Sequence, residues 1–277
     1  MEIGAKFKNI TSYNLEMTKS LEDKLFFVEE FPKNENYIFV DFGCADGTML
    51  RALHKIYRSG LCHFIGYDIS TTMIEFASHS LSTNEQEIRF YDNWDMLYNY
   101  VASLLRSEKD FRCKIVLICS SVIHEVYSYG NENSIDKFWN ILNDNIFDYV
   151  VVRDMMVSKE LCKIPFKEKI KAVPYRPNLK NIKFYISEFE SEWGKINNIC
   201  RLIHFLLKYR WTQNWNRELK ENYLPICTEY FLGKMQLKHN ISYLELFKVP
   251  FLEQCWKDDF GIIIEYPTHI KAIFKHV

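Results

Sequence analysis

Short apolar runs alternate with amphipathic stretches through residues 33–164, a part of the chain that contains no proline. A short apolar run bounded by turn residues is typical of a buried strand, and apolar residues three and four apart are typical of a helix. This alternation predicts right-handed crossovers and an α/β fold with a parallel, doubly wound sheet. The predicted strands are Tyr37–Phe42, Phe64–Asp68, Ile88–Asp92, Lys114–Ser120 and Tyr149–Arg153. Four helices are predicted between them: Thr48–Arg58, one that starts at Ser70, one that follows the third strand and ends at about Arg106, and Ser134–Ile146.

The pattern changes on both sides of this unit. An amphipathic helix is predicted over Leu15–Phe31, so that residues 1–32 would form an N-terminal helical cap. After residue 157, helical patterns replace strands, and two strands then follow. We therefore expect one domain built from 33–157 plus 239–277, with a helical insertion at 158–238 between the fifth and sixth strands. The helical patterns are Ser187–Tyr209 and Arg217–Lys238, and the two strands are Ser242–Val249 and His269–Val277.

Composition narrows the class of protein. The 277 residues are 48% hydrophobic and carry a formal net charge of −1, which excludes a mainly disordered chain and an overall polycation. No apolar run approaches the roughly 18 residues that a membrane-spanning helix needs, and residues 1–6 contain no signal-peptide core. The eight cysteines form no C-x-x-C pair. We therefore predict no metal site, reduced thiols and a cytoplasmic protein.

The strongest motif follows the first predicted strand, in Asp41-Phe42-Gly43-Cys44-Ala45-Asp46-Gly47. A loop between a strand and a helix brings the backbone close to a ligand, and the N-terminus of the helix points its amides at that ligand. The dinucleotide fingerprint G-x-G-x-x-G fails here because positions 45 and 48 are Ala and Thr. A structural joint between strand and helix, without a ligand, would use the same residue types.

The spacing D-x-G-x-G-x-G, with Ala45 at the middle glycine, resembles the first motif of the class I S-adenosylmethionine (SAM)-dependent methyltransferases. The resemblance covers 33–157 and extends by topology to 241–277. It implies a mostly parallel seven-stranded sheet with an antiparallel last strand, SAM as the cofactor and S-adenosylhomocysteine (SAH) as the product. By this resemblance Gly43, Cys44 and Ala45 would line the methionine part of SAM, Asp41 would hold its amino group, and Asp46 and Gly47 would belong to the same loop.

Asp68 ends the second predicted strand, 21 residues after Gly47. A carboxylate near this spacing accepts both ribose hydroxyls of an adenosine cofactor, and a helix-capping aspartate without a ligand is the alternative. Asp92 and Asn93 follow the third predicted strand, but turn chemistry alone also favours an Asp-Asn pair there. The resemblance assigns further residues after the second, third and fourth strands: Ile69 or Met73 would pack on the adenine, Asp92 would meet its amino group with Asn93 nearby, and Ser120 and Ser121 would complete the cofactor-binding set.

Methyl transfer is an in-line displacement at a sulfonium carbon, so an enzyme must place a lone pair behind that carbon and can need to remove a proton. His124, just past the fourth strand, is the predicted base, with Glu125 as the second choice; alternatively, His124 is architectural. Tyr127 and Tyr129 could form walls of the acceptor pocket or belong to the core. Arg153 could orient a carboxylate or phosphate, or pair with the aspartate that follows it.

We predict a SAM-dependent methyltransferase that acts by O- or N-methylation on a small acceptor, anionic acceptors included. The Asp/Asn-Pro-Pro-aromatic loop of base-amine methyltransferases and the Pro-Cys pair of cytosine C5 enzymes are both missing. RNA is the second choice, bound by basic and aromatic residues of 158–220, because 158–184 alone holds eight basic and two acidic residues. A SAM-binding module without transfer is the third. No membrane partner is expected, and the oligomeric state stays open.

Overall fold

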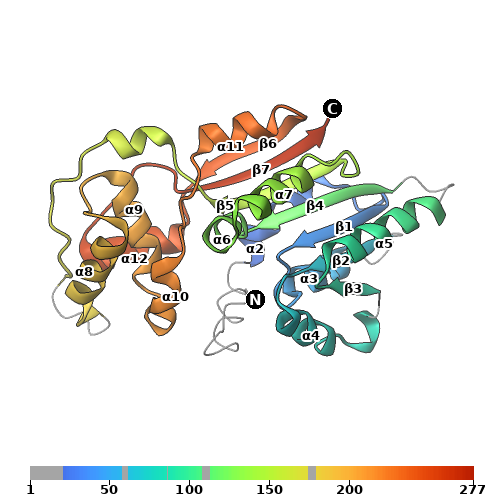
Figure 1. Cartoon of the computed structure of the whole chain (residues 1–277), viewed down its shortest axis with the longest axis horizontal. Coiled ribbons are helices and arrows are strands. Elements are labelled where there is room, and N and C mark those ends of the chain that lie inside the picture. The colour runs from blue at the N-terminus through green and yellow to red at the C-terminus, as the bar shows by residue number, and fades with distance from the viewer. Residues whose placement is uncertain (1–20, 58–61, 86, 108–112, 174–178) are drawn as a thin grey trace.

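A computed structural model describes residues 21–57, 62–85, 87–107, 113–173 and 179–277. At its centre lies a seven-stranded sheet with the order β3-β2-β1-β4-β5-β7-β6 (Figure 1). Strands β1 to β5 are parallel, whereas β7 lies antiparallel between β5 and β6. The predicted fold class is therefore confirmed. The strands are β1 (Tyr37–Phe42), β2 (His63–Tyr67), β3 (Ile88–Tyr91), β4 (Lys114–Ser120), β5 (Tyr149–Met155), β6 (His239–Phe247) and β7 (His269–His276).

Helices cover both faces of the sheet and form a separate group beside it. The α-helices are α2 (Leu21–Lys24), α3 (Thr48–Ile56), α4 (Thr71–His79), α5 (Trp94–Ser107), α6 (Ile123–Tyr129), α7 (Glu132–Leu142), α8 (Ile182–Trp193), α9 (Ile199–Lys208), α10 (Trp215–Lys220), α11 (Thr228–Met235) and α12 (Pro250–Phe260). Short 3-10 helices are η1 (Phe26–Glu30), η2 (Thr83–Glu85), η3 (Lys159–Lys163) and η5 (Thr212–Asn214).

Alternate side chains of the strands enter two different cores, as the period of two in a strand requires. Ile38 and Val40 of β1 face the core that α5, α7 and α11 cover. Tyr37 and Phe39 face the opposite core, which α3 and η1 cover. Because both faces are buried, the strands read as nearly continuous apolar runs, and this is why β1 and β4 were predicted with the bounds that they have.

Two long helices were predicted wrongly. The stretch Ser187–Tyr209 is divided into α8 and α9 because Gly194 ends α8 with a φ of 83°, a backbone conformation that helices do not continue. The stretch Arg217–Lys238 is divided into α10 and α11 by a segment that contains Pro225. The helix predicted at Ser134–Ile146 instead starts after the Asn131 cap and ends at Leu142. Elsewhere the largest shift at a strand start is in β6, which begins at His239 rather than at Ser242.

The predicted helix Leu15–Phe31 lies partly outside the described residues. Within them, α2 is followed by the tighter η1, so the predicted single helix does not extend through this part of the chain. Phe27 and Phe31 nevertheless enter the sheet core beside Tyr37, as an amphipathic pattern requires. The Ser70 cap is confirmed, because its side chain accepts a hydrogen bond from the backbone of α4.

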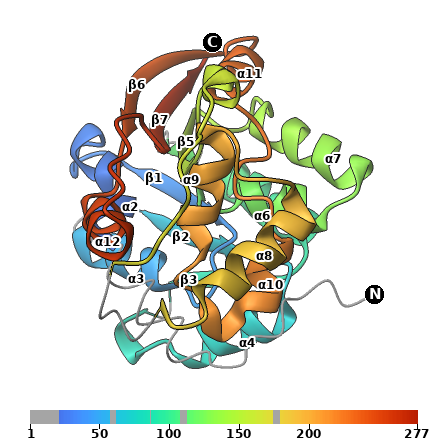
Figure 2. The same ribbon diagram turned by 90° about the vertical axis from the view of Figure 1, so that its left-hand side faces the viewer.

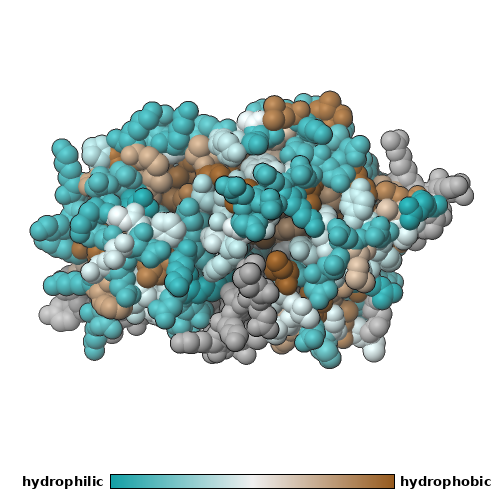
Figure 3. All heavy atoms as spheres, in the orientation of Figure 1, coloured by the Kyte–Doolittle hydropathy of each residue, from teal (hydrophilic) through white to brown (hydrophobic). Residues whose placement is uncertain are grey.

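The insertion packs around a core of its own, beside the carboxyl ends of the parallel strands (Figures 1 and 2). This core unites α8, α9 and α10 with α12, a helix that the sequence analysis did not predict. In contrast, α11 packs Phe231 and Met235 against the sheet. Hydrophilic residues cover most of the face seen in Figure 3, with apolar residues in scattered small groups. Along the described ranges, no helix is long and apolar enough to cross a membrane.

We expect Trp256→Ala to lower the free energy of unfolding by about 3–5 kcal/mol, because deletion of a large buried aromatic leaves a cavity. The Trp256 side chain is fully buried, and its Nε1 donates a hydrogen bond to the carbonyl of Leu206 at 2.9 Å. Urea unfolding followed by circular dichroism measures the loss. The matched control is Trp211→Ala, since Trp211 is 38% exposed, and an equal loss in both variants would contradict the expectation.

Candidate active site

The loop between β1 and α3 has a backbone conformation that few residue types accept. Gly43 and Gly47 have φ values of 81° and 74°, in the left-handed region that favours glycine. A Cβ added at Gly43 would lie 2.7 Å from Val122, and one at Gly47 would lie 2.5 Å from Phe90. Ala45, at the middle glycine of the motif, also has a positive φ of 47°. Strained backbone of this kind gathers at sites that clamp ligands.

Asp68, directly after β2, ties this loop to the second strand. Its Oδ2 accepts a hydrogen bond from the amide of Ala45 at 3.0 Å, and its Oδ1 accepts one from the amide of Ser70 at 2.9 Å. Each carboxylate oxygen has a further lone pair, so both can still accept a ligand hydroxyl. Burial raises the pKa of Asp68 above its usual value, although the two amides act against this. Asp68 is thus a candidate to hold a ribose next to the loop.

The residues predicted to meet the adenine come from α4 and from the end of β3. Met73 is buried in α4, whereas Ile69 exposes 64% of its surface. Asp92 accepts a hydrogen bond from Thr71 Oγ1 at 3.1 Å, which joins the two elements. Asn93 caps α5, where its Oδ1 accepts a backbone amide at 3.0 Å. The structure therefore joins the start of α4 to Asp92 through Thr71 and gives Asn93 a structural contact.

A pocket lies between the loop and α2. Ser120 Oγ, at the end of β4, is buried and lacks a hydrogen-bond partner within the described residues, so a ligand could satisfy it. Asp41 is 2% exposed, and burial raises its pKa to about 7 although Lys24 acts to lower it. Asp46 accepts a hydrogen bond from the amide of Thr48, the first residue of α3, at 3.0 Å. The lining residues are Leu21, Lys24, Asp41, Gly43, Cys44, Asp46, Thr48, Met49 and Ser120.

These residues fit the methionine end of SAM. Asp41 offers a carboxylate to an ammonium group, and the Ser120 hydroxyl is an unpartnered polar atom in the same pocket. Burial raises the pKa of the Cys44 thiol well above its usual value, so this side chain is a neutral part of the wall. The candidate residues for the methionine, ribose and adenine parts lie in that order at the ends of β1, β2 and β3.

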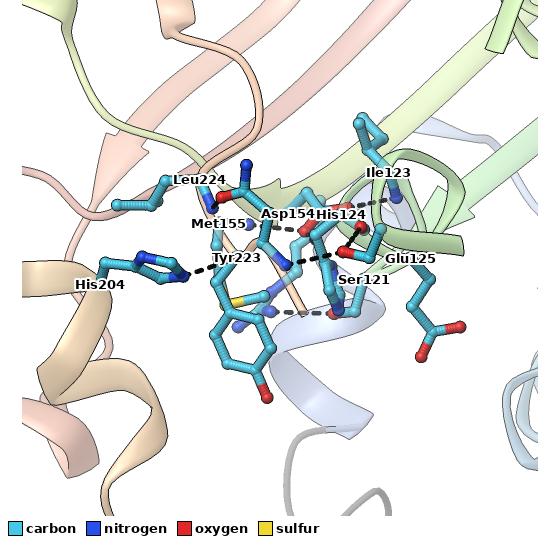
Figure 4. A network of polar contacts seen from close by, with 12 residues as sticks. Ser121, Ile123, His124, Glu125, Asp154, Met155, His204, Tyr223 and Leu224 are labelled. Carbon is cyan, nitrogen blue, oxygen red and sulfur yellow. Dashed lines mark hydrogen bonds and ion pairs between the residues drawn. The ribbon is translucent and has the colours of Figure 1, made fainter. Parts of the chain in front are cut away.

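His124 lies in α6 and pairs with Asp154 of β5 (Figure 4). Its Nδ1 is 3.0 Å from Oδ1 of Asp154, and both side chains are buried. Asp154 is fixed by the amides of Ile123 and Met155 at 2.7 and 2.8 Å. Burial lowers the pKa of His124, but Asp154 outweighs this and raises it above its usual value. Burial would likewise raise the pKa of Asp154, yet His124 and the amides hold it below its usual value.

The insertion contacts α6 from the other side. Arg217 of α10 pairs with Glu125 at 2.8 Å and with Glu221 at 2.7 Å. The ring of Tyr223 meets the ring of His124 edge-on, with 5.1 Å between their centroids. Figure 4 shows the Glu125 carboxylate and the Tyr223 hydroxyl pointing away from the His124–Asp154 pair. His124 is therefore enclosed between the sheet and the insertion, whereas the Glu125 side chain is 37% exposed.

The two predicted tyrosines have different surroundings. The hydroxyl of Tyr127 accepts a hydrogen bond from Trp139 Nε1 at 2.9 Å, and its ring packs against the sheet core. Tyr127 is therefore not brought to the pocket. Tyr129 donates a hydrogen bond to Glu221 at 2.7 Å, so it lies at the contact between α6 and the insertion. Of the two, only Tyr129 lies where an acceptor could reach it.

Arg153 is engaged inside the protein. Its Nη2 and Nε donate to Asp23 at 2.6 and 2.9 Å, and its Nη1 donates to Ser121 at 3.2 Å. The partner is thus Asp23 of α2 and not the adjacent Asp154, which instead holds His124. Ser121 has a positive φ of 58°, so the backbone after β4 is strained as well. Arg153 therefore fixes α2 to the end of β5.

Sequence reasoning missed Lys24, the role of Asp154 and the role of Arg217. Each reaches the site through a contact between elements far apart in the chain, which no local pattern records. A signal existed for Asp154, because the carboxyl ends of neighbouring parallel strands meet at the ligand-bearing edge of the sheet. Within the described ranges, no group of three or more His, Cys, Asp or Glu side chains is placed to hold a metal ion.

Comparison with known proteins gives a fold and no close relative. No protein-family model and no curated protein matches the sequence. The pyocyanin biosynthetic protein PhzM is similar over 98% of this chain and 60% of its own, with a TM-score of 0.51 and 10% identity. A SAM-dependent methyltransferase from Aquifex aeolicus is similar over 98% of this chain and 100% of its own, with a TM-score of 0.47 and 11% identity. The sheet order, the loop after β1 and the likeness to PhzM agree, and the chain has the fold of the class I SAM-dependent methyltransferases.

Proposed function

We propose that this protein transfers a methyl group from SAM to an oxygen or nitrogen of a small acceptor and releases SAH. The observation that carries the proposal is the buried His124–Asp154 pair beside the cofactor loop, with 3.0 Å between Nδ1 and Oδ1. A SAM-binding module without transfer would not need an oriented imidazole at this position. The pair is the arrangement that a general base requires, since a carboxylate on one ring nitrogen fixes the tautomer and leaves the other nitrogen as the acceptor.

In this proposal the cofactor supplies an electrophilic methyl group on a positively charged sulfur. Asp68 holds the ribose hydroxyls, and Asp41 holds the methionine ammonium. The loop backbone at Gly43 lies along the part of SAM between these two groups. Met73 and Ile69 pack on the adenine. Rigid placement of this kind favours an in-line geometry, because it removes the freedom that the two reactants would otherwise lose on reaction.

His124 then takes the proton of the acceptor. Asp154 accepts from Nδ1, so Nε2 is the nitrogen that receives the proton, and the same carboxylate stabilises the imidazolium that forms. The two backbone amides on Asp154 keep that carboxylate in place. Glu125 is a less suitable base, because Arg217 already pairs with it at 2.8 Å.

The contacts inside the insertion favour a small acceptor over RNA. Several basic and aromatic residues of 201–220 are used inside the insertion. Lys208 is fully buried and donates to the carbonyl of Glu218 at 2.6 Å, Arg210 pairs with Asp259 at 2.8 Å, and Trp215 is 5% exposed. Side chains in such contacts cannot track a phosphate backbone or stack on bases.

The proposal is tested with two fractions of a cell extract, one of small molecules and one of RNA. We expect SAH to accumulate when the protein and SAM meet the small-molecule fraction, and a product to gain the mass of one methyl group in mass spectrometry. Generic RNA should bind weakly at physiological salt. The logarithm of its affinity should fall with the logarithm of the salt concentration far less steeply than the ~−0.7 per phosphate contact that single strands show. Charge reversal at the exposed Lys167, Lys169 and Lys171 should leave turnover largely unchanged.

Two results would contradict this expectation in different ways. Turnover with the RNA fraction alone, lost in the triple-reversal variant, would favour the RNA methyltransferase. Tight SAM binding without SAH formation in either fraction would favour a binding module.

A further inference from the structure

Helix α2 reaches into the cofactor pocket from a part of the chain that the methyltransferase resemblance does not cover. Leu21 and Lys24 both line that pocket, and Lys24 is 6% exposed. Between them, Asp23 faces the other way and pairs with Arg153 at 2.6 Å and with Lys271 at 2.7 Å. These two ion pairs fix α2 on β5 and β7, so the Lys24 side chain is held toward the pocket by its neighbour in sequence.

The pocket therefore contains buried groups of opposite charge. Among the described residues that line it, Lys24 is the one basic side chain, and Asp41 and Asp46 are the acidic ones. Burial lowers the pKa of Lys24 to about 8, and Arg153 adds to this, whereas Asp41, Asp154 and Asp46 oppose it. A buried charge is retained at low cost only where a partner of opposite charge meets it. Asp41 and Lys24 thus provide one site for a cation and one for an anion.

This pair of charges matches an α-amino acid. The methionine end of SAM carries an α-ammonium and an α-carboxylate on one carbon, and both lose water when they enter the pocket. Asp41 accounts for the ammonium but leaves the carboxylate facing acidic side chains. A charge-assisted hydrogen bond is about twice as strong as a neutral one. Such a bond from a lysine would offset the repulsion between the carboxylate and these acidic side chains.

We infer that Lys24 binds the α-carboxylate of SAM, and that α2 thereby makes the pocket specific for a cofactor with an intact amino-acid end. The inference rests on the proposed function, because it takes SAM as the ligand. Lys24 is a binding residue here and takes no part in proton transfer. Without the ligand, Lys24 and Asp41 offset each other's charge; with the ligand, each would pair with the opposite group of the methionine.

The test compares SAM with decarboxylated SAM, two ligands that differ only in the α-carboxylate. Calorimetry on the full chain measures both affinities. Wild-type protein should bind SAM at least about tenfold more tightly than decarboxylated SAM, since only SAM brings the carboxylate that would pair with Lys24. Lys24→Met should weaken SAM binding by at least about tenfold and change the affinity for decarboxylated SAM by less than about threefold. The preference should then vanish or reverse, because the pocket keeps its acidic groups.

The matched control is Lys271→Met. Lys271 also pairs with Asp23 but does not line the pocket, so a loosened α2 would weaken both ligands alike. If Lys24→Met does not fold, Lys24→Gln replaces it, since its shorter neutral side chain can still hydrogen-bond within the pocket. Equal affinity of Lys24→Met and wild type for SAM, or equal losses for the two ligands, would overturn the inference alone. Failure of wild-type protein to bind SAM would overturn the proposed function and this inference together.

Discussion

His124→Ala is expected to lower turnover by about 10²–10⁴-fold on the true acceptor, the range that loss of a positioned general base produces. The affinity for SAM should be nearly unchanged, because His124 does not line the methionine pocket. Removal of the imidazole leaves Asp154 with its two backbone amides but without its buried partner, so some stability is also lost. His124→Asn is the better variant, since its amide can still donate to Asp154 while it cannot accept the proton.

Initial rates and calorimetry separate a base from a bracing residue. His79→Ala is the matched control, because His79 is exposed on α4. If His124→Asn loses cofactor affinity or thermal stability while its turnover stays close to that of wild type, His124 is architectural. Equal turnover in wild type and in both His124 variants would remove this residue from the mechanism.

The pH dependence gives an independent check. The base acts in its neutral form, so kcat/KM should rise with pH through the pKa of His124, which Asp154 raises above the ordinary ~6.5. Asp154→Asn removes the main cause of that rise and leaves burial, which lowers the pKa of His124, opposed only by the smaller effects of Glu125 and Glu221. The acidic limb of the profile should therefore move to lower pH in Asp154→Asn, while the maximum rate falls. A limb that does not move would show that another group controls it.

Asp68→Ala is expected to weaken SAM binding by at least about 100-fold, because two hydrogen bonds to a charged acceptor contribute ~1.5–3 kcal/mol each. The structure adds a second reason: the same carboxylate holds the amide of the strained Ala45 at 3.0 Å. Loss of Asp68 therefore removes a ribose contact and releases the loop that shapes the methionine pocket.

Calorimetry with SAH, which cannot react further, measures this loss. Asp95→Ala is the matched control, since the Asp95 side chain is 79% exposed and pairs with Lys137 only at 3.8 Å. Unchanged affinity in Asp68→Ala, or tighter binding of NAD than of SAH by wild-type protein, would contradict the assignment of this pocket to SAM.

The sheet could be predicted from the sequence because its strands are buried on both faces and the pattern is local. The course of the helical insertion could not, since amphipathic periodicity continues across Gly194, where the backbone turns. The cofactor loop was also within reach, because a φ above zero requires residues such as Gly43 and Gly47. The partners of the predicted residues were not: Arg153 meets Asp23 and Glu125 meets Arg217 across more than ninety positions of sequence, and only the folded chain brings them together.

The place of β7 between β5 and β6 also sets the order in which the molecule can be completed during synthesis. Chains emerge from the ribosome N-terminus first and fold as segments become free. The parallel strands β1 to β5 can pair as they emerge, but β6 pairs with β7 alone and must wait for it. The core of the insertion waits too, because α12, which supplies Trp256 to it, follows β6. Until residues 256–274 are made, the nascent protein therefore exposes an open strand edge at β5 and an unfilled helical core, the features that chaperones recognise and that favour aggregation.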